Sequence, residues 1–130
     1  MRTSTLLSAL GFVVALGGAA QAHHSAVMFD RSRVLAVRGT VKTFEFSSPH
    51  SWVALEVTQP GKSITEWDLE GEDTVRLMRD GLARDTLKAG DQVTVGFYQL
   101  RDGRPIGQLL YITAANGKTY GVNPMPSSPR

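Results

Sequence analysis

Three histidines are the residues whose types and positions could support chemistry. His23 and His24 are adjacent near the N-terminus, and His50 lies within Pro49-His50-Ser51-Trp52. If the chain is cleaved after Ala22, the free amine and the ring nitrogen of His23 form a chelate. A further imidazole completes the three-nitrogen set that suits Cu(II). The sequence therefore predicts a candidate copper site made of His23 and His50, with His24 as the other candidate ligand.

Cleavage is expected because the first 22 residues have the parts of a secretory signal. Arg2 supplies the charged start, an apolar run covers residues 6–16, and Ala20-Gln21-Ala22 is a small-x-small cleavage site. The apolar run is too short to span a membrane, so no transmembrane segment is expected after cleavage. The predicted location is the periplasm or the exterior, and residues 23–33 become an N-terminal lead segment that lies against the body.

Distance limits the copper hypothesis. A strand over residues 34–46 separates the lead segment from His50, and it spans up to about 40 Å if straight. Residues 24–33 reach at most about 35 Å. The chelate therefore closes within one chain only if that strand coils strongly and the lead doubles back. The simpler interpretation is that His50 is a turn residue bonded to the backbone, with His23 and His24 solvated; these two alone could still capture copper or zinc weakly.

The elements that must position these residues follow from hydrophobic periodicity. Alternation predicts strands, a change of period predicts a helix, and Asp102-Gly103 predicts a hairpin turn. The expected strands are 34–46, 50–58, 64–70, 92–100 and 107–114, with a short extra strand at 118–122 and a helix at 74–80. Three strands, a helix and two strands is the order of the OB-fold. We therefore expect a mainly β domain over residues 34–122. It is predicted to be a small five- to six-stranded OB-like barrel with one short helix between strands 3 and 4. A disordered tail is expected at 123–130. The alternative is a small open β-sandwich.

Side-chain parity predicts local features of these elements. The buried face of the first strand changes near Thr43, which indicates a bulge, and Gly39 in mid-strand indicates a close backbone approach. Asp73 is the expected helix cap. The apolar side of the helix is predicted to consist of Val75, Met78 and Leu82.

Composition excludes several classes of function. The chain has no cysteine, so disulfides, thiolate metal sites and thiol nucleophiles are absent. It has 14 basic and 12 acidic residues, and removal of the signal leaves 13 against 12. A surface with balanced charge lacks the basic footprint that nucleic acid demands. No nucleic-acid partner is expected.

Other chemistry has weaker support. Ser51 follows His50 directly, so the two side chains point to opposite faces of a strand and do not form a hydrolytic pair. Glu66, Asp68 and Glu70 share one strand face, which could hold a hard cation or a carboxyl pair but is more often the wet side of a strand. The aromatic residues could form a stacking platform if exposed, although a domain this small needs most of them inside. No catalytic residue is assigned, and an enzyme is the less favoured class.

Several short motifs together resemble a family. They are His23-His24-Ser25, Met28-Phe29-Asp30, Gly39-x-Val41, Pro49-His50-Ser51-Trp52, Glu66-Trp67 with Glu70-Gly71, and Leu87-Lys88-x-Gly90-Asp91-x-Val93-Thr94-Val95 with Arg101-Asp102-Gly103. In order and spacing they resemble a family of small exported bacterial proteins catalogued as domain of unknown function 6152. Ser48 stands where members usually carry Asn. The resemblance implies an exported β-rich domain and no established activity.

Two functional hypotheses follow. The first is an exported, non-enzymatic binding module for a small ligand or a protein partner, with Pro49, His50, Ser51, Trp52 and Arg101 as candidate ligand-binding residues. Arg101 is included because it flanks the loop that OB-folds use for ligands. The alternative is a copper-binding protein that uses His23 and His50.

Overall fold

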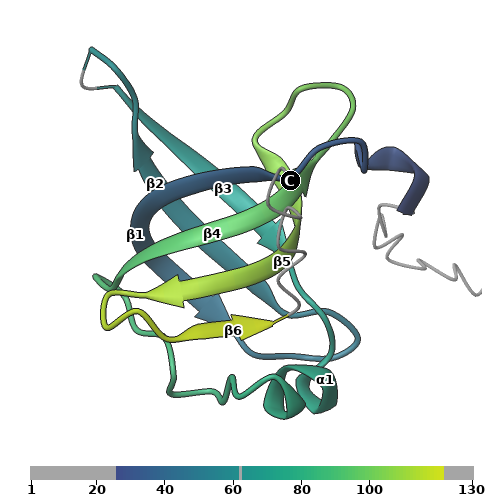
Figure 1. Cartoon of the computed structure of the whole chain (residues 1–130), viewed down its shortest axis with the longest axis vertical. Coiled ribbons are helices and arrows are strands. Elements are labelled where there is room, and N and C mark those ends of the chain that lie inside the picture. The colour runs from purple at the N-terminus through teal and green to yellow at the C-terminus, as the bar shows by residue number, and fades with distance from the viewer. Residues whose placement is uncertain (1–25, 62, 122–130) are drawn as a thin grey trace, which may run out of the picture.

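Alternating apolar and polar residues give this chain strands that close into a barrel (Figure 1). The computed structural model describes residues 26–61 and 63–121. The predicted signal segment, His23, His24 and the tail at 123–130 lie outside these residues. In chain order the elements are η1, a turn of 3-10 helix (Ala26–Met28), β1 (Leu35–Glu45), β2 (Trp52–Thr58), β3 (Ile64–Glu70), α1 (Thr74–Arg79), β4 (Gln92–Gln99), β5 (Ile106–Ala114) and β6 (Thr119–Gly121).

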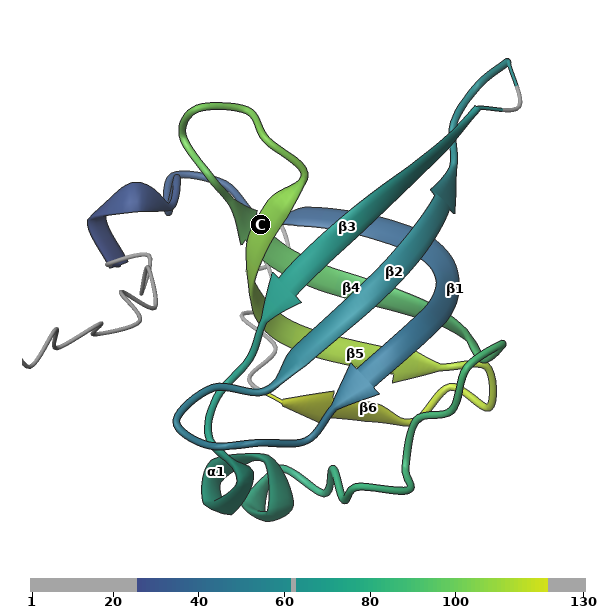
Figure 2. The ribbon, with the colours of Figure 1, turned by 180° about the vertical axis from the view of Figure 1, so that it is seen from behind.

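The strand order is β3-β2-β1-β4-β5-β6, and every pair of neighbours in this order is antiparallel. A parallel pairing between β3 and β5, over residues 68–70 and 106–108, joins the two sides of the sheet. Five strands therefore form a closed barrel, and β6 extends it at the other half of β5 (Figure 2). The OB-like barrel is confirmed, and the open sandwich does not form.

Two local features, a β-bulge and a glycine, bend β1 so that it can pair with both β2 and β4. The register with β2 shifts between Val41 and Thr43, which confirms the predicted bulge. Gly39 lies where a Cβ atom would come within 2.6 Å of the Glu56 carbonyl oxygen and 2.8 Å of Leu55 Cγ. Because real Cβ atoms do not approach backbone so closely, glycine is required at this position, as the sequence predicts.

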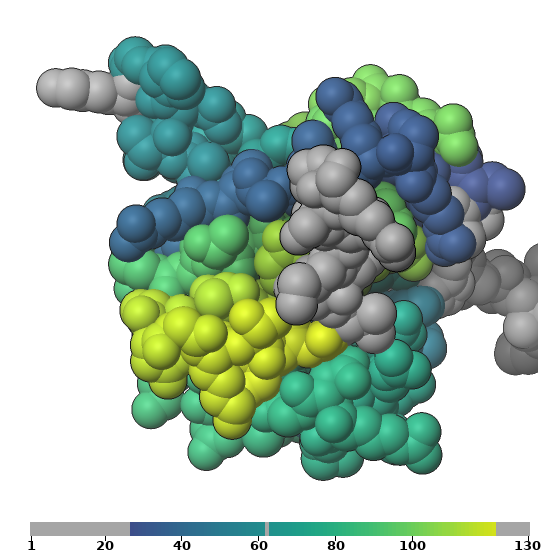
Figure 3. Space-filling view, viewed as in Figure 1, coloured from purple at the N-terminus to yellow at the C-terminus, as the bar shows by residue number. Residues whose placement is uncertain are grey.

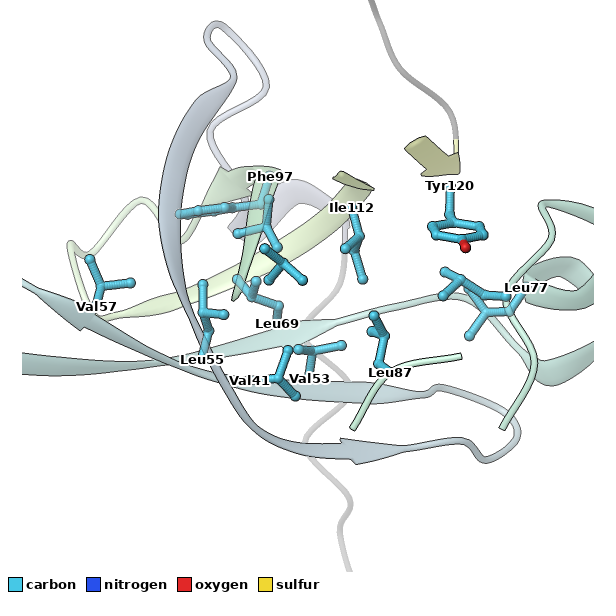
Figure 4. Packing of buried hydrophobic residues seen from close by; sticks show 13 residues of the cluster. Val41, Val53, Leu55, Val57, Leu69, Leu77, Leu87, Phe97, Ile112 and Tyr120 are labelled. Atoms are coloured by element: carbon cyan, nitrogen blue, oxygen red, sulfur yellow. The ribbon is translucent and has the colours of Figure 1, made fainter. Parts of the chain in front are cut away.

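The barrel interior is filled by inward-facing aliphatic and aromatic side chains from every barrel strand (Figure 4). Val53, Leu55 and Val57 of β2 are all buried, in agreement with the predicted alternation. Trp67 of β3 packs against Phe97 of β4, with ring centroids 4.8 Å apart. This inward packing leaves the alternate positions of β1, β2 and β3 on the outer face.

Helix α1 covers one end of the barrel, and its packing corrects one prediction. Asp73 caps it as expected, because its side chain accepts a hydrogen bond from the Arg76 N–H. The predicted apolar side is wrong in two of its three residues. Val75 and Met78 are each 54% exposed, whereas Leu77 and Leu82 are buried. Leu77 and Leu82 belong to the same buried cluster as Tyr120 of β6, a neighbour that helical spacing cannot reveal.

The lead segment is attached at the opposite end of the barrel (Figures 1 and 2). Phe29 is 1% exposed and pairs with Leu100, and the Asp30 N–H donates to the Gln99 carbonyl oxygen at 2.8 Å. Figure 3 shows the dark blue lead beside the green β4–β5 loop. The lead therefore lies against the body through Phe29, as predicted, whereas the Val27 and Met28 side chains are exposed.

Candidate functional site

The predicted segment Pro49-His50-Ser51-Trp52 lies in the β1–β2 connection, at the end of the barrel beside α1 (Figure 2). Ser51 is 1% exposed, and its Oγ donates to the Ser47 carbonyl oxygen at 2.9 Å and accepts from the Ser47 N–H at 3.2 Å. Its backbone N–H donates to the Glu72 carbonyl oxygen, and its own carbonyl accepts from the Gly71 N–H. Ser51 therefore fixes the shape of the loop.

The same loop is tied to the start of α1. Ser48 Oγ lies 3.0 Å from Thr74 Oγ1 and accepts a hydrogen bond from the Thr74 N–H at 3.3 Å. Pro49, which follows a cis peptide bond, is exposed beside this contact. The helix and the loop thus support each other at the end of the barrel.

His50 faces a buried acidic residue. Its Nδ1 lies 3.3 Å from Glu70 Oε1 and 3.3 Å from the Gly71 carbonyl oxygen. The Glu70 side chain is 9% exposed, and within the described ranges its Oε2 is buried without a hydrogen-bond partner. A buried acceptor without a partner is costly, and Oε2 is closed off from solvent, so it is not a contact point on the surface.

Next to this pair, the outer face of the sheet carries a shallow open groove of about 430 Å3. It crosses β1, β2 and β3 to the start of β5, and its lining residues are Thr43, Glu45, Trp52, Ala54, Asp68 and Ile106. We call it the Trp52 groove. Trp52 pairs with Glu45 on one side and with Glu70 on the other. The half-buried indole therefore lies between two acidic residues on the neighbouring strands.

The face is acidic. Strand alternation places five acidic residues on the outer side of this part of the sheet: Glu45, Glu56, Glu66, Asp68 and Glu70. The cation that reaches across it is Lys42, whose Nζ donates to Glu66 Oε2 at 2.6 Å. The hydrogen bond to Glu66, then the charge of Glu66 and, after these, the charges of Glu56 and Asp68 raise the pKa of Lys42 above its usual 10.5. Lys42 is thus protonated at neutral pH and already bound.

Arg101 is not brought together with the other candidate residues. It lies in the β4–β5 loop, where its Nε donates to the Val27 carbonyl oxygen at 3.0 Å and its N–H to the Met28 carbonyl oxygen. The loop that it belongs to leads into Ile106, at the far side of the Trp52 groove. Its guanidinium holds the lead segment in place.

The candidate copper ligands are only partly described. His23 and His24 lie outside the described residues. The lead that follows them is attached at the end of the barrel opposite the β1–β2 loop, which carries His50 (Figures 1 and 2). In residues 26–61 and 63–121, no group of three or more histidine and acidic side chains is placed to hold a metal ion. Within the same part of the chain, no helix is both long enough and apolar enough to cross a membrane.

Sequence reasoning missed the groove and the burial of Glu70. Ala54 and Ile106 are unremarkable in the sequence, and they meet Thr43 only through the register of four strands. Alternation predicts a wet strand face for Glu70 together with Glu66 and Asp68, but Glu70 is 7% exposed. The one available signal was its position at the end of β3, where the β1–β2 loop folds over it.

Comparisons with known proteins place the chain in a family. A search of curated proteins and a search of solved structures each gave no match. The model described as a family of unknown function (DUF6152) matches residues 10–109, which is most of the 130-residue chain and confirms the resemblance found in its motifs. The chain therefore belongs to the DUF6152 family.

Proposed function

We propose that this protein is an exported, non-enzymatic binding module whose ligand lies in the Trp52 groove. The observation that carries the proposal is the position of the groove on the outer face of β2 and β3, beside the β1–β2 loop and ending at the β4–β5 loop. In barrels of this topology, that face and those two loops bind ligands. Trp52 supplies a large, rigid contact surface of the kind that dominates binding energy.

The surroundings of the groove favour binding over catalysis. Ser51, which follows His50 in the chain, is buried and bonded to the backbone of Ser47, and the Ser47 hydroxyl donates to the His50 carbonyl oxygen, so neither hydroxyl is placed as a nucleophile beside the imidazole. The rest of the loop is braced by Ser48 against α1. A braced loop beside an open groove suits recognition, because a rigid site loses less entropy on binding.

The binding site can be tested before a ligand is known. We would screen the 15N-labelled protein against mixtures of small fragments and follow amide shifts by NMR. The expected result is that hits cluster at groove positions such as Thr43, Ala54 and Asp68, and are lost in Trp52→Ala. Val75→Ala removes an exposed apolar side chain on α1, away from the groove, and should leave the hits unchanged. Hits elsewhere, or hits that survive Trp52→Ala in a folded variant, would refute the assignment.

Export is tested separately. We expect the full-length chain, expressed in a bacterium with an outer membrane, to be recovered from the periplasm with a mass that begins at His23. Retention of residues 1–22 on the protein recovered from the cytoplasm would refute it. The expectation rests on the charged start, apolar run and Ala20-Gln21-Ala22 site.

The copper alternative makes a different prediction. Four residues from His23 to Ala26 reach at most about 14 Å, while η1 lies at the end of the barrel opposite His50. For this reason we rank it second. Tight one-to-one Cu(II) binding that collapses in His50→Ala would favour copper over the binding module, and binding that persists in His50→Ala would leave His23 and His24 as the ligands.

A further inference from the structure

The charge of the face around the Trp52 groove differs from that of the chain as a whole. The chain carries 14 basic and 12 acidic residues. On the outer side of β2, β3 and the second half of β1, five acidic residues stand against one lysine, and that lysine is bound to Glu66. A ligand that approaches this face therefore meets a negative potential, which favours a cation and repels an anion.

From this charge and from Trp52, we infer that the Trp52 groove binds a basic segment of a partner protein, with a lysine or arginine side chain seated over Trp52 between Glu45 and Asp68. This inference rests on the proposed function and names its ligand class. An indole face attracts ammonium and guanidinium groups, and the flanking acidic side chains add charge-assisted hydrogen bonds.

A second observation points to the same chemistry. Glu70 faces the outer side of the sheet directly beside Trp52, and its Oε2 is buried without a partner among the described residues. Glu70 Oε1 is already engaged with His50 at 3.3 Å. Oε2 is closed off from solvent and Glu70 does not line the groove, so this residue adds negative potential at Trp52 and not a direct contact. Lysine and arginine side chains carry donors and no acceptor, which suits the exposed carboxylates of Glu45 and Asp68.

The shape of the groove favours a protein segment over a free small cation. Pockets for small molecules enclose most of their ligand, whereas this groove is shallow and open and crosses four strands. An extended chain can lie along it and make many modest contacts. The groove runs across the strands, and its two acidic residues, Glu45 and Asp68, lie on β1 and β3 on either side of β2. Basic side chains of one extended segment can therefore meet both.

The probe is a fluorescently labelled heptapeptide, Gly-Lys-Gly-Lys-Gly-Lys-Gly with both ends blocked, titrated by fluorescence anisotropy. We expect saturable binding that weakens as NaCl rises from 50 to 500 mM, because salt screens exposed charges. Asp68→Asn and Glu45→Gln should each weaken binding about two- to fivefold, and Trp52→Ala about tenfold. Asp85→Asn neutralises an exposed acidic residue between α1 and β4 and should leave the affinity unchanged. Asp68→Asn and Glu45→Gln replace each side chain with one of the same size and shape, so they test the charge even if Trp52→Ala does not fold.

The outcomes separate the inference from the proposed function. The inference is overturned if a peptide with Glu in place of Lys binds as tightly as the lysine peptide. It is also overturned if Asp68→Asn and Glu45→Gln do not change the affinity for the lysine peptide. Spermine that occupies the groove more tightly than the lysine peptide also overturns it, in favour of a free polyamine. If neutral fragments bind in the groove and the lysine peptide does not, the basic partner is wrong while the binding module stands. If nothing binds in the groove, both fall.

Discussion

Removing the Ser51 hydroxyl should destabilise the protein far more than its small size suggests. Ser51 is 1% exposed, and its Oγ satisfies both the N–H and the carbonyl oxygen of Ser47. In Ser51→Ala these two groups lose their partner inside the loop. A polar group left without a partner in a buried position costs about 1–3 kcal/mol. Ser47 is half-buried, so water reaches part of it, and we expect a total loss of about 1–3 kcal/mol rather than twice that.

The matched control is Ser47→Ala. It removes one hydrogen bond, from Ser47 Oγ to the His50 carbonyl oxygen at 2.8 Å, and keeps the Ser47 backbone bonded to Ser51. One hydrogen bond contributes about 0.5–1.5 kcal/mol net, so this variant should lose less stability than Ser51→Ala. For a domain of about 100 residues, each kcal/mol lowers the melting temperature by about 4–8 °C.

Urea unfolding followed by tryptophan fluorescence and far-ultraviolet circular dichroism would measure both variants. We expect coincident transitions, an unchanged slope and a lower midpoint for Ser51→Ala. A Ser51→Ala midpoint equal to that of the unmodified protein, or above that of Ser47→Ala, would show that the hydroxyl does not hold the loop. The reasoning about how His50 and Trp52 are positioned would then fail as well.

Three other predictions test the barrel and the lead segment. Gly39→Ala should lower the free energy of unfolding by about 1–3 kcal/mol, because the new Cβ would lie 2.6 Å from a backbone oxygen. Gly71→Ala is the control and should be neutral, since no atom lies nearer than 3.5 Å to its Cβ position. Equal urea midpoints for the two variants would contradict this. Leu55→Ala, at a fully buried position, should cost about 2–5 kcal/mol in the same assay. Hydrogen bonds from the Ser32 side chain and then its backbone lower the pKa of Asp30 below 3.8, so the stability that this residue contributes is present above 3.8 and is lost as the pH falls through its folded pKa. An NMR titration should find this low pKa, and Ser32→Ala should raise it.

Much of the barrel could be predicted because its strands obey simple alternation. Val53, Leu55 and Val57 sit at every second position and are all buried. The bulge before Thr43 could be predicted too, since the buried parity changes there. These features are local, so they are visible in a single strand.

The helix and the site could not be predicted in the same way. Helix α1 has apolar residues on more than one side, and Leu77 is buried because it meets the barrel end near Tyr120, more than 40 positions later in the chain. The Trp52 groove combines residues of four strands through a register that includes the bulge. Distant contacts of this kind are set by the closed barrel and leave no periodic signal in the sequence.

Along β3, burial differs between the open end of the strand and the end beside the candidate site. Ile64, Glu66 and Asp68 are exposed at successive outward positions, and Glu70, the next one, is 7% exposed. The change occurs where the β1–β2 loop, held by Ser51, brings His50 over the end of the strand. Because a charge interacts more strongly where water is excluded, the same acidic group has more influence at this end than at the open end of β3. Selectivity for a cation should therefore be strongest beside Trp52 and weakest toward Glu66, where Lys42 already neutralises the face.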